Sequence, residues 1–435
     1  MACVEQARTA ERTGQYALAR RLYERALHLL ADAETGPSAA TLLRWVGNAH
    51  LDEGDGEAAL DCYLASHAVA ELNDDGQSIA HALNCMGIIH QIWGKLDEAD
   101  SYYRDAGALA SEAGELRLQA MVFQNLGAVA NTRGDLPRAL EYYRLSLERY
   151  RELRDEQYIG QVLNNLGVIL TDLEQWDEAE ATFSESAALC EKVGDLRTRV
   201  LVECNRTELY IHRGELDRAT ASCDASFELA SRIDYQLGLG EAYRNYGVIF
   251  REMGQLGLAE MHLRTAGEIA ERYTNPLLAA EVQRELAEVY RGQDRNREAL
   301  QALTYAHRVF EELRARRDLA DVDRRIGELE ELYLQVVRKW GESIESKDRY
   351  TAGHCQRVAD YGCMLAKALG YDEQTLTWFR MGAFLHDVGK TIIPEEILNK
   401  EGQLTPEEWE TMKRHTIVGV ELLSTIEFPW DVRPM

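Results

Sequence analysis

The sequence is short of proline, of basic charge and of long apolar runs. Its 435 residues include 7 prolines, whereas an average usage of about 5% would give roughly 22. Few helix-breaking residues over such a length predict an almost wholly helical protein. No apolar stretch approaches the roughly 18 residues that a membrane-spanning helix needs. The first residues lack the apolar run of a secretory signal, so neither a membrane partner nor secretion is expected.

The charge and the cysteines exclude further classes of protein. Asp and Glu number 74 against 48 Lys and Arg, which gives a net charge of −26. A surface of that sign argues against nucleic-acid binding, which depends on a basic patch. The eight cysteines form no C-x-x-C pair and no pattern of a secreted disulfide framework. We therefore expect small buried thiols in a reducing, cytoplasmic compartment.

An alanine recurs every forty residues along most of the chain, in eight successive copies. Its positions are Ala19, Ala59, Ala99, Ala139, Ala179, Ala219, Ala259 and Ala299. Four residues later the early copies carry an aromatic side chain, and five residues earlier six copies carry a glycine. A small residue lets two helices approach closely, and a glycine permits a tight turn between them. Each copy is therefore predicted to be an antiparallel helix pair that buries its apolar face by stacking on its neighbours.

This pattern resembles the tetratricopeptide repeat (TPR) family. The copy from Asn125 to Leu147, NLGAVANTRGDLPRALEYYRLSL, carries the glycine and alanine positions of the family signature. The period of forty residues exceeds the usual period of about 34. Over residues 1–312, the resemblance implies an all-α, right-handed superhelical solenoid of about eight helix pairs. It also implies a concave groove that binds a peptide or protein ligand.

Asparagine stands two residues before the helical glycine position in four consecutive copies. These residues are Asn125, Asn165, Asn205 and Asn245. The resemblance to peptide-binding members of the family implies that they line the groove and bond to the ligand backbone, because an amide both donates and accepts. The structural alternative is that they bond between adjacent units and hold the stack together. Both interpretations remain open at this point.

A different apolar period follows the repeats, over residues 313–346. Apolar side chains alternate steps of four and three residues, as in the seam of a coiled coil. The seam consists of Val322, Ile326, Leu329, Tyr333, Val336 and Trp340. We expect a long helix that joins the repeats to an output domain. Its seam either pairs two chains into a homodimer or packs on the last repeat as a cap.

The histidines whose sequence surroundings indicate a chemical role lie in the C-terminal segment, residues 347–435. The motif LHDVGK places His386 and Asp387 within a predicted apolar helix, where a carboxylate is costly unless a metal ion or a cation compensates its charge. His354 lies 32 residues earlier and His415 lies 29 residues later. The residues that share a predicted helix face with His354 are Val358, Tyr361 and Leu365. Three inward-facing histidines and an aspartate on separate helices predict a divalent metal site.

Adjacent histidine and aspartate suit the chemistry of two metal ions. The histidine binds one ion, while Asp387 has two oxygens with which to bridge a pair of ions. Such a pair activates water at neutral pH and stabilises an in-line attack on phosphorus. Lys390, one turn further on, is positioned to meet a phosphate oxygen. The motif therefore predicts phosphoryl hydrolysis.

Two stretches of this segment, KDRYTAGHCQRVADY and LHDVGKTIIPEEILNKEGQLTPEEWETMKRHTIVGVELL, resemble the first half of an HD-GYP domain. That family belongs to the HD superfamily of metal-dependent phosphohydrolases and hydrolyses cyclic di-GMP. The resemblance implies phosphate contact by Lys390 and two divalent ions, iron or manganese, with Asp387 as the bridging ligand. The implied metal ligands are His354, His386, Asp387 and His415.

The segment also departs from the family pattern. Some members hold a third metal with a glutamate four residues before the first histidine, where this chain has Tyr350. The resemblance therefore implies a two-metal site. The family continues with paired histidines, a Gly-Tyr-Pro motif and a further metal-binding aspartate, none of which is reached before residue 435. We therefore expect a fragment of a longer enzyme that is inactive by itself.

Together these patterns predict a bacterial signalling protein in which a TPR sensor controls a cyclic di-GMP phosphodiesterase. One alternative is an adaptor that binds a peptide or protein while its HD domain is catalytically silent. Another is an HD-type hydrolase that acts on a different nucleotide. Metal content separates the first two, because the enzyme should hold about two ions per chain and the adaptor none.

Overall fold

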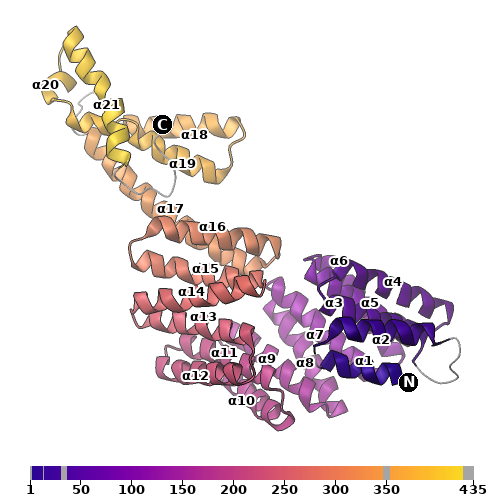
Figure 1. Cartoon of the computed structure of the whole chain (residues 1–435). Helices are drawn as coiled ribbons and strands as arrows, with labels where there is room; N and C mark the ends of the chain where they lie inside the picture. Colours follow the sequence, from indigo (N-terminus) through magenta and orange to yellow (C-terminus); the bar gives the residue numbers. More distant parts are fainter. Residues whose placement is uncertain (1, 13, 31–36, 346–352, 425–435) are drawn as a thin grey trace. The chain divides into compact units, whose positions relative to one another are not determined.

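The computed structural model describes residues 2–12, 14–30, 37–345 and 353–424. These residues form 21 α-helices and the 3-10 helix η2, with no strand among them (Figure 1). The helices are α1 Ala2–Arg12, α2 Tyr16–His28, α3 Ala39–Asp52, α4 Gly56–Leu72, α5 Gly76–Ile92, α6 Leu96–Glu112, α7 Leu116–Thr132, α8 Leu136–Leu153, α9 Glu156–Asp172, α10 Trp176–Val193, α11 Leu196–His212, α12 Leu216–Arg232, α13 Gln236–Glu252, α14 Leu256–Arg272, α15 Pro276–Gly292, α16 Asn296–Glu312, α17 Arg316–Glu345, α18 His354–Ala368, α19 Glu373–Leu385, η2 Val388–Ile392, α20 Glu395–Leu398 and α21 Pro406–Ser424. The all-α prediction is confirmed.

Two expectations from composition can be compared with the described residues. No helix in this part of the chain combines the length and the apolarity that crossing a bilayer requires. All eight cysteines are free thiols, and six of them are buried. The prediction of buried thiols therefore holds for most of them.

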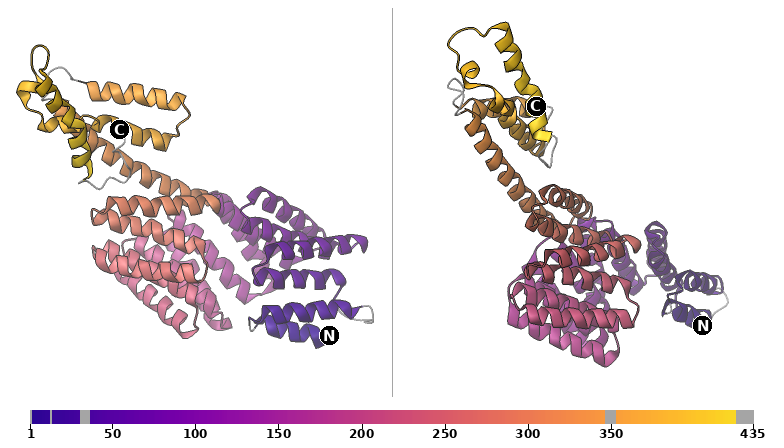
Figure 2. Two further views of the ribbon diagram at one scale, coloured as in Figure 1. Left: turned by 45° about the horizontal axis from the view of Figure 1, so that its top comes forward. Right: turned by 60° about the vertical axis from the view of Figure 1, so that its left-hand side comes forward.

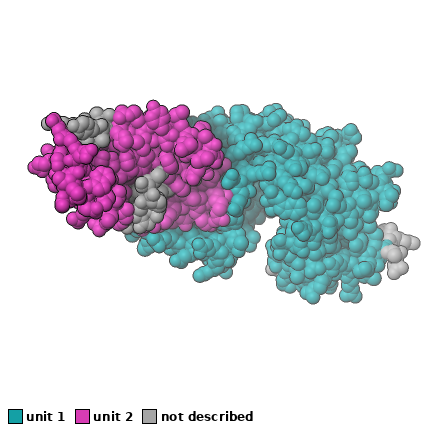
Figure 3. All heavy atoms as spheres, turned by 90° about the horizontal axis from the view of Figure 1, so that it is seen from above, with its two compact units in different colours: residues 1–279, 309–318 teal, residues 280–308, 319–435 magenta. Residues whose placement is uncertain are grey.

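The chain packs into two compact units (Figure 3). Unit 1 comprises residues 1–279 and 309–318, and unit 2 comprises residues 280–308 and 319–435. Most of the eighth helix pair, α15 and α16, thus belongs with α17 and the C-terminal helices. The boundaries predicted at residues 312 and 346 follow the sequence pattern, whereas the packing groups the last pair with the output segment.

In unit 1, antiparallel helices stack in chain order from α1 to α14 (Figures 1 and 2). Each helix packs on the next one along the chain, both within a pair and between pairs. All eight periodic alanines are fully buried, seven of them in this unit. The small side chain recurs because it stands where two helices approach closely.

Turns between the helices recur every twenty residues, twice as often as the periodic glycines indicate. A residue with positive φ occupies each such position from 54 to 314. Gly54 has φ of +86°, but Asp74 and Arg154 adopt the same left-handed conformation at +50° and +54°. At the Gly54 turn, the Asp55 N–H donates to the His50 carbonyl at 2.9 Å, which ties the turn to the end of the preceding helix. These backbone bonds stabilise the turn even where the residue is not glycine.

The helical glycine of a pair leaves space for the aromatic ring of the same pair. A Cβ added to Gly167 would lie 2.5 Å from the ring of Phe183. At Gly127 the corresponding distance to Tyr143 is 2.9 Å. The ring therefore packs directly on the helix backbone, which explains why glycine and aromatic recur together.

Gly167→Ala is expected to destabilise unit 1 by about 1–3 kcal/mol, because the added methyl overpacks the buried Phe183 ring. Gly257→Ala is the matched control, since a Cβ there meets no atom within 4 Å. The control should be neutral or stabilising by at most about 1 kcal/mol. Urea unfolding followed by circular dichroism measures the free energy of unfolding of both variants. Equal stability of the two variants would contradict the close packing.

His262 on α14 is surrounded by aromatic rings in unit 1. The ring centroids of Tyr243, Tyr246 and Phe250 lie 5.8, 5.4 and 5.1 Å from its own. Its Nδ1 atom is buried and has no hydrogen-bond partner. Burial lowers the pKa of His262, because the imidazolium would lose its hydration there.

Lowering the pH from about 7.5 to about 5 is therefore expected to reduce the Tm of unit 1. The unfolded chain binds a proton on His262 more readily than the folded one, so stability falls as the pH drops below about 6.5. His262→Phe keeps a ring but cannot titrate, and its Tm should fall less over this range. His28→Phe, at an exposed position, should behave like the wild type. An unchanged pH dependence in His262→Phe would contradict the assignment.

Helix α17 is the long helix expected after the repeats, with 30 residues. Its first half packs on the α15–α16 pair within unit 2. Arg325 Nη1 lies 2.9 Å from Glu288 Oε1, and His307 Nε2 lies 3.1 Å from Asp323 Oδ1. This half of α17 therefore caps the last helix pair, which was one of the two predicted roles.

The predicted seam of α17 changes register along the helix. Val322 and Leu329 are buried as expected. Val336 and Trp340 are 42% and 37% exposed, and Val337 is buried in their place. In the second half of the helix, Arg338 and Gly341 lie against Phe384 of α19. Pairing of two chains through α17 stays a prediction.

Candidate metal centre

Three helices and one turn of unit 2 position the predicted metal ligands. His354 is the first residue of α18, and His415 lies on α21. His386 is the C-terminal cap of α19, and Asp387 precedes η2. The prediction that His386 and Asp387 lie within one helix is wrong. Helix α19 ends just before them, and the chain then tightens into a 3-10 turn that packs against α21.

The structure brings the four predicted ligands together. One ligand atom each from His354, His386 and Asp387 lies within 4.8 Å of the other two. His386 Nε2 is 3.3 Å from Asp387 Oδ2, and His415 Nε2 is 3.7 Å from Asp387 Oδ1. The rings of His354 and His386 lie edge to face, with centroids 5.4 Å apart. Three imidazoles therefore surround one carboxylate.

Backbone carbonyls orient two of these histidines. His386 Nδ1 lies 2.6 Å from the Ala383 carbonyl oxygen, and His415 Nδ1 lies 2.6 Å from that of Met412. A proton on Nδ1 that bonds to a carbonyl leaves the Nε2 lone pair free, which is the usual state of a metal-ligating histidine. Three imidazoles and a carboxylate suit first-row divalent metals such as iron, manganese and zinc. The residues present therefore fit a divalent metal ion.

Asp387 is a buried carboxylate beside cationic groups. Its Oδ2 lies 2.8 Å from Lys390 Nζ. Burial alone would raise the pKa of Asp387, but hydrogen bonds from His386 and Lys390 hold it well below its ordinary range. The hydrogen bond to Asp387 in turn raises the pKa of His386. Lys390, predicted to contact phosphate, thus compensates the carboxylate in this structure.

A close backbone approach places His415 beside the other predicted ligands. A Cβ added to Gly389 would lie 1.8 Å from the His415 carbonyl oxygen and 2.8 Å from the Gly419 nitrogen. The turn after Asp387 can meet α21 only because residue 389 has no side chain. Sequence reasoning missed this role, although a glycine follows the HD pair by two residues and another follows His415 by four.

Helix α21 starts as the sequence predicts. The Glu408 N–H donates to Thr405 Oγ1 at 3.3 Å, and the Thr405 N–H donates to Glu408 Oε2 at 2.7 Å. Pro406 is the first residue of the helix. This reciprocal capping box defines the start of the helix that carries His415. Tyr350, at the position of the third-metal glutamate, lies outside the described residues.

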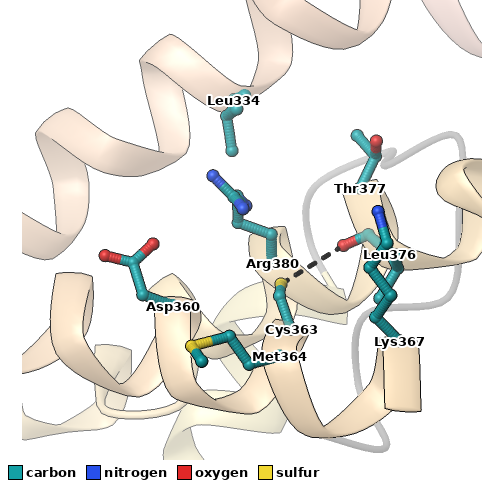
Figure 4. Close-up of a pocket in the computed structure, with 8 residues that line it drawn as sticks. All are labelled: Leu334, Asp360, Cys363, Met364, Lys367, Leu376, Thr377 and Arg380. Atoms are coloured by element: carbon teal, nitrogen blue, oxygen red, sulfur yellow. Dashed lines mark hydrogen bonds between the residues drawn. The ribbon is translucent and has the colours of Figure 1, made fainter. Parts of the chain in front are cut away.

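A cavity of about 420 Å³ lies among α17, α18 and α19 (Figure 4). Its lining residues are Leu334, Asp360, Cys363, Met364, Lys367, Leu376, Thr377 and Arg380. None of the predicted metal ligands lines it. The Cys363 thiol donates to the Leu376 carbonyl oxygen at 3.7 Å, which ties α18 to α19 beside the cavity. The cluster of predicted metal ligands and this cavity are therefore separate features of unit 2.

Three of the four recurring asparagines bond to the preceding repeat. The bonds are Asn125 Nδ2 to Asn84 Oδ1 (3.0 Å), Asn205 Nδ2 to Asn164 Oδ1 (2.9 Å) and Asn245 Nδ2 to the Cys204 carbonyl oxygen (3.0 Å). Asn245 is fully buried, whereas Asn165 is partly exposed. This geometry favours the structural alternative, and a ligand-binding role for the asparagines stays a prediction.

Family models match along the chain. Residues 152–359 match the MalT-like TPR region, and residues 2–38, 37–112 and 78–152 match tetratricopeptide repeat models. Residues 351–435 match the HD domain. The chain is therefore a tetratricopeptide-repeat protein with an HD domain at its C-terminal end.

Curated relatives match over the HD region. The cyclic di-GMP phosphodiesterase of Thermotoga maritima is 38% identical over 102 residues, which are 23% of this chain and 28% of that protein. The cyclic di-GMP phosphodiesterase response regulator RpfG of Xanthomonas campestris pv. campestris is 36% identical over 99 residues, 23% and 26% of the two chains. The 3'3'-cGAMP-specific phosphodiesterase 3 of Vibrio cholerae serotype O1 is 35% identical over 96 residues, 22% and 21%. The matched stretch thus spans 21–28% of the length of these relatives.

Solved structures resemble the helix-pair array. Aspartyl phosphate phosphatase F from Bacillus subtilis has a TM-score of 0.54 and 13% identity, covering 71% of this chain and 93% of that one. A Rap protein complexed with competence and sporulation factor has a TM-score of 0.52 and 14% identity, covering 75% and 98%. At these identities the likeness concerns the fold alone. It confirms the predicted solenoid of helix pairs.

Proposed function

We propose that this protein is a signalling enzyme in which the tetratricopeptide repeats control a metal-dependent phosphodiesterase that acts on cyclic di-GMP. The observation that carries the proposal is the cluster of three histidines around the buried carboxylate of Asp387. The curated relatives that share the HD region are named as cyclic di-GMP or cGAMP phosphodiesterases.

In this proposal His354, His386, His415 and Asp387 would hold the divalent ions, iron or manganese, of which the resemblance implies two. Ions bound there supply a hydroxide nucleophile at neutral pH and stabilise the charge that develops on the phosphate. The carbonyl bonds to Nδ1 of His386 and His415 keep each Nε2 directed toward Asp387. Lys390 exchanges its bond with Asp387 for one to a phosphate oxygen when substrate binds.

Control by the repeats is proposed to pass through α17. Its first half packs on α15 and α16, and Gly341 near its end lies against Phe384, two residues before His386. A peptide or protein bound in the groove of the repeats would shift this helix and, through it, the metal ligands. The packing of α17 at both ends supports this route within unit 2.

An adaptor with a catalytically silent HD domain is the alternative. One observation favours it, because the Lys390 ammonium lies 2.8 Å from Asp387 and can itself compensate the charge of the carboxylate. The repeats would then act by binding a peptide or protein. A Rap protein of similar fold was solved with competence and sporulation factor.

Metal content and turnover distinguish the two functions. Because residues 1–435 by themselves are expected to be inactive, the protein is expressed from its whole gene, loaded with Mn²⁺ or Fe²⁺ and incubated with cyclic di-GMP, and the products are separated by ion-exchange chromatography. We expect about two ions per chain and formation of pGpG or GMP. Glu410 is an exposed residue of α21, and Glu410→Gln should leave the metal content and the product formation unchanged. A chain that binds no metal, or binds metal without hydrolysis, would contradict the phosphodiesterase and favour the adaptor.

A further inference from the structure

The last turn of α17 contacts both helices that lead to the metal ligands. We propose that Glu345, the final residue of α17, is a positioning residue for the metal site. Its carboxylate holds the start of α18 and thereby the backbone of His354. This inference rests on the proposed metal site and adds a residue that lies outside its ligand set.

The carboxylate of Glu345 bonds to two backbone groups on either side of His354. The Gly353 N–H donates to Oε2 at 2.7 Å, and the Cys355 N–H donates to Oε1. The first N–H groups of a helix have no partner within the helix, and an anion near them also interacts favourably with the helix dipole. Because the N-cap residue Gly353 has no capping side chain, Glu345 takes that role from the preceding helix.

The conformation of Gly353 suits this arrangement. Its φ of +67° lies in the left-handed region, which glycine adopts without strain. An added Cβ would also lie 3.1 Å from Arg357 Nη1. The carboxylate of Glu345 therefore holds the N–H groups of the residues directly before and directly after His354. Its backbone cannot shift far without breaking a bond to Glu345.

A close approach one turn earlier fixes α17 against the same elements. Gly341 is buried, and a Cβ added to it would lie 3.2 Å from the Phe384 carbonyl oxygen and 3.7 Å from Cys355 Cβ. Gly341 and Glu345 are four residues apart and therefore share a face of α17. Phe384 lies two residues before the predicted ligand His386, and Cys355 directly follows the predicted ligand His354. This face of α17 thus sets the spacing between the two ligand-bearing helices.

Glu345→Gln tests the role with little change in shape. The amide keeps one acceptor oxygen but turns an NH₂ group toward a backbone N–H, so one of the two bonds is lost. Changes to residues that orient metal ligands weaken metal binding by about 10–100-fold. Glu342→Gln is the matched control, since Glu342 lies on the same turn of α17 and is exposed.

The full chain and both variants are titrated with Co²⁺, and the ligand-field absorption bands report affinity and coordination geometry. Circular dichroism and thermal unfolding report folding. We expect Glu345→Gln to fold like the wild type, to bind Co²⁺ about 10–100-fold more weakly and to show altered bands. Glu342→Gln should match the wild type in affinity and spectrum.

The outcomes separate this inference from the proposed function. A wild-type chain that binds no Co²⁺ contradicts the metal site itself. Wild-type binding together with equal affinity and identical bands in Glu345→Gln overturns the positioning role and leaves the site standing. If Glu345→Gln does not fold, Gly341→Ala replaces it, because it disturbs the same face of α17. Unchanged Co²⁺ affinity in Gly341→Ala would then overturn the inference.

Discussion

Asp387→Asn is expected to weaken Mn²⁺ binding by more than about 100-fold, beyond the loss seen when supporting residues change. Asp387 is the centre of the cluster, because its two oxygens face the Nε2 atoms of His386 and His415 at 3.3 and 3.7 Å. The amide removes the negative charge and one acceptor oxygen. It also removes the carboxylate charge that lies 2.8 Å from the Lys390 ammonium. Without a negative charge among the three imidazoles and the ammonium, the site attracts a metal ion much less strongly.

Isothermal titration with Mn²⁺ and elemental analysis of the dialysed chain measure this effect. Asp360→Asn is the control, because Asp360 lies on α18 at the cavity wall and bonds to Gln356 rather than to a metal ligand. It should bind Mn²⁺ like the wild type. Wild-type affinity in Asp387→Asn would show that this carboxylate holds no metal.

Gly389→Ala is expected to destabilise unit 2 by about 3 kcal/mol or more, at the upper end of the cost of overpacking. The added Cβ would lie 1.8 Å from the His415 carbonyl oxygen. Both neighbours at the contact, the His415 carbonyl and the Gly419 nitrogen, are backbone atoms that cannot turn aside. The turn after Asp387 must therefore separate from α21, and His415 moves away from the cluster with it.

Thermal unfolding measures the stability loss, and Mn²⁺ titration measures the effect on the site. Gly327→Ala on α17 is the control, because a Cβ there meets no atom within 4 Å. The control should be neutral or stabilising by at most about 1 kcal/mol, as alanine is the better helix former. A Gly389→Ala variant with the stability and the Mn²⁺ affinity of the control would contradict the close approach.

The repeat architecture could be predicted in detail because its determinants are local and periodic. The buried alanine and the glycine beside an aromatic ring recur in register, so each reports the same helix contact many times. The turns between pairs could not be predicted in this way. Residues such as Asp74 and Arg154 adopt positive φ there, since the bonds to the preceding helix compensate for an unfavourable side chain.

The inward face of α18 shows where sequence reasoning failed. Sequence reasoning placed the side chains of Tyr361 and Leu365 on the buried face with His354, but these side chains are 69% and 64% exposed. The buried side chains are instead those of Cys355 and Ala359 and the residues that continue their stripe. His354 is the first residue of α18, and its ring meets His386 at the end of the helix. The direction of the His354 side chain therefore does not indicate which face of α18 packs on α19.

Scarce proline and an alanine every forty residues thus determined by themselves that the chain is a helical array, and the motifs LHDVGK and GHC predicted His386, Asp387 and His354 as metal ligands. These features depend on residue type and spacing along one helix, which a sequence displays directly. Only the tertiary structure decided that His386 and Asp387 leave the helix, that Lys390 compensates Asp387, and that Glu345 holds His354. The first two depend on how the turn after α19 packs against α21, and the third joins two helices. Backbone approaches such as Gly389 to His415 leave only a glycine as their trace in the sequence.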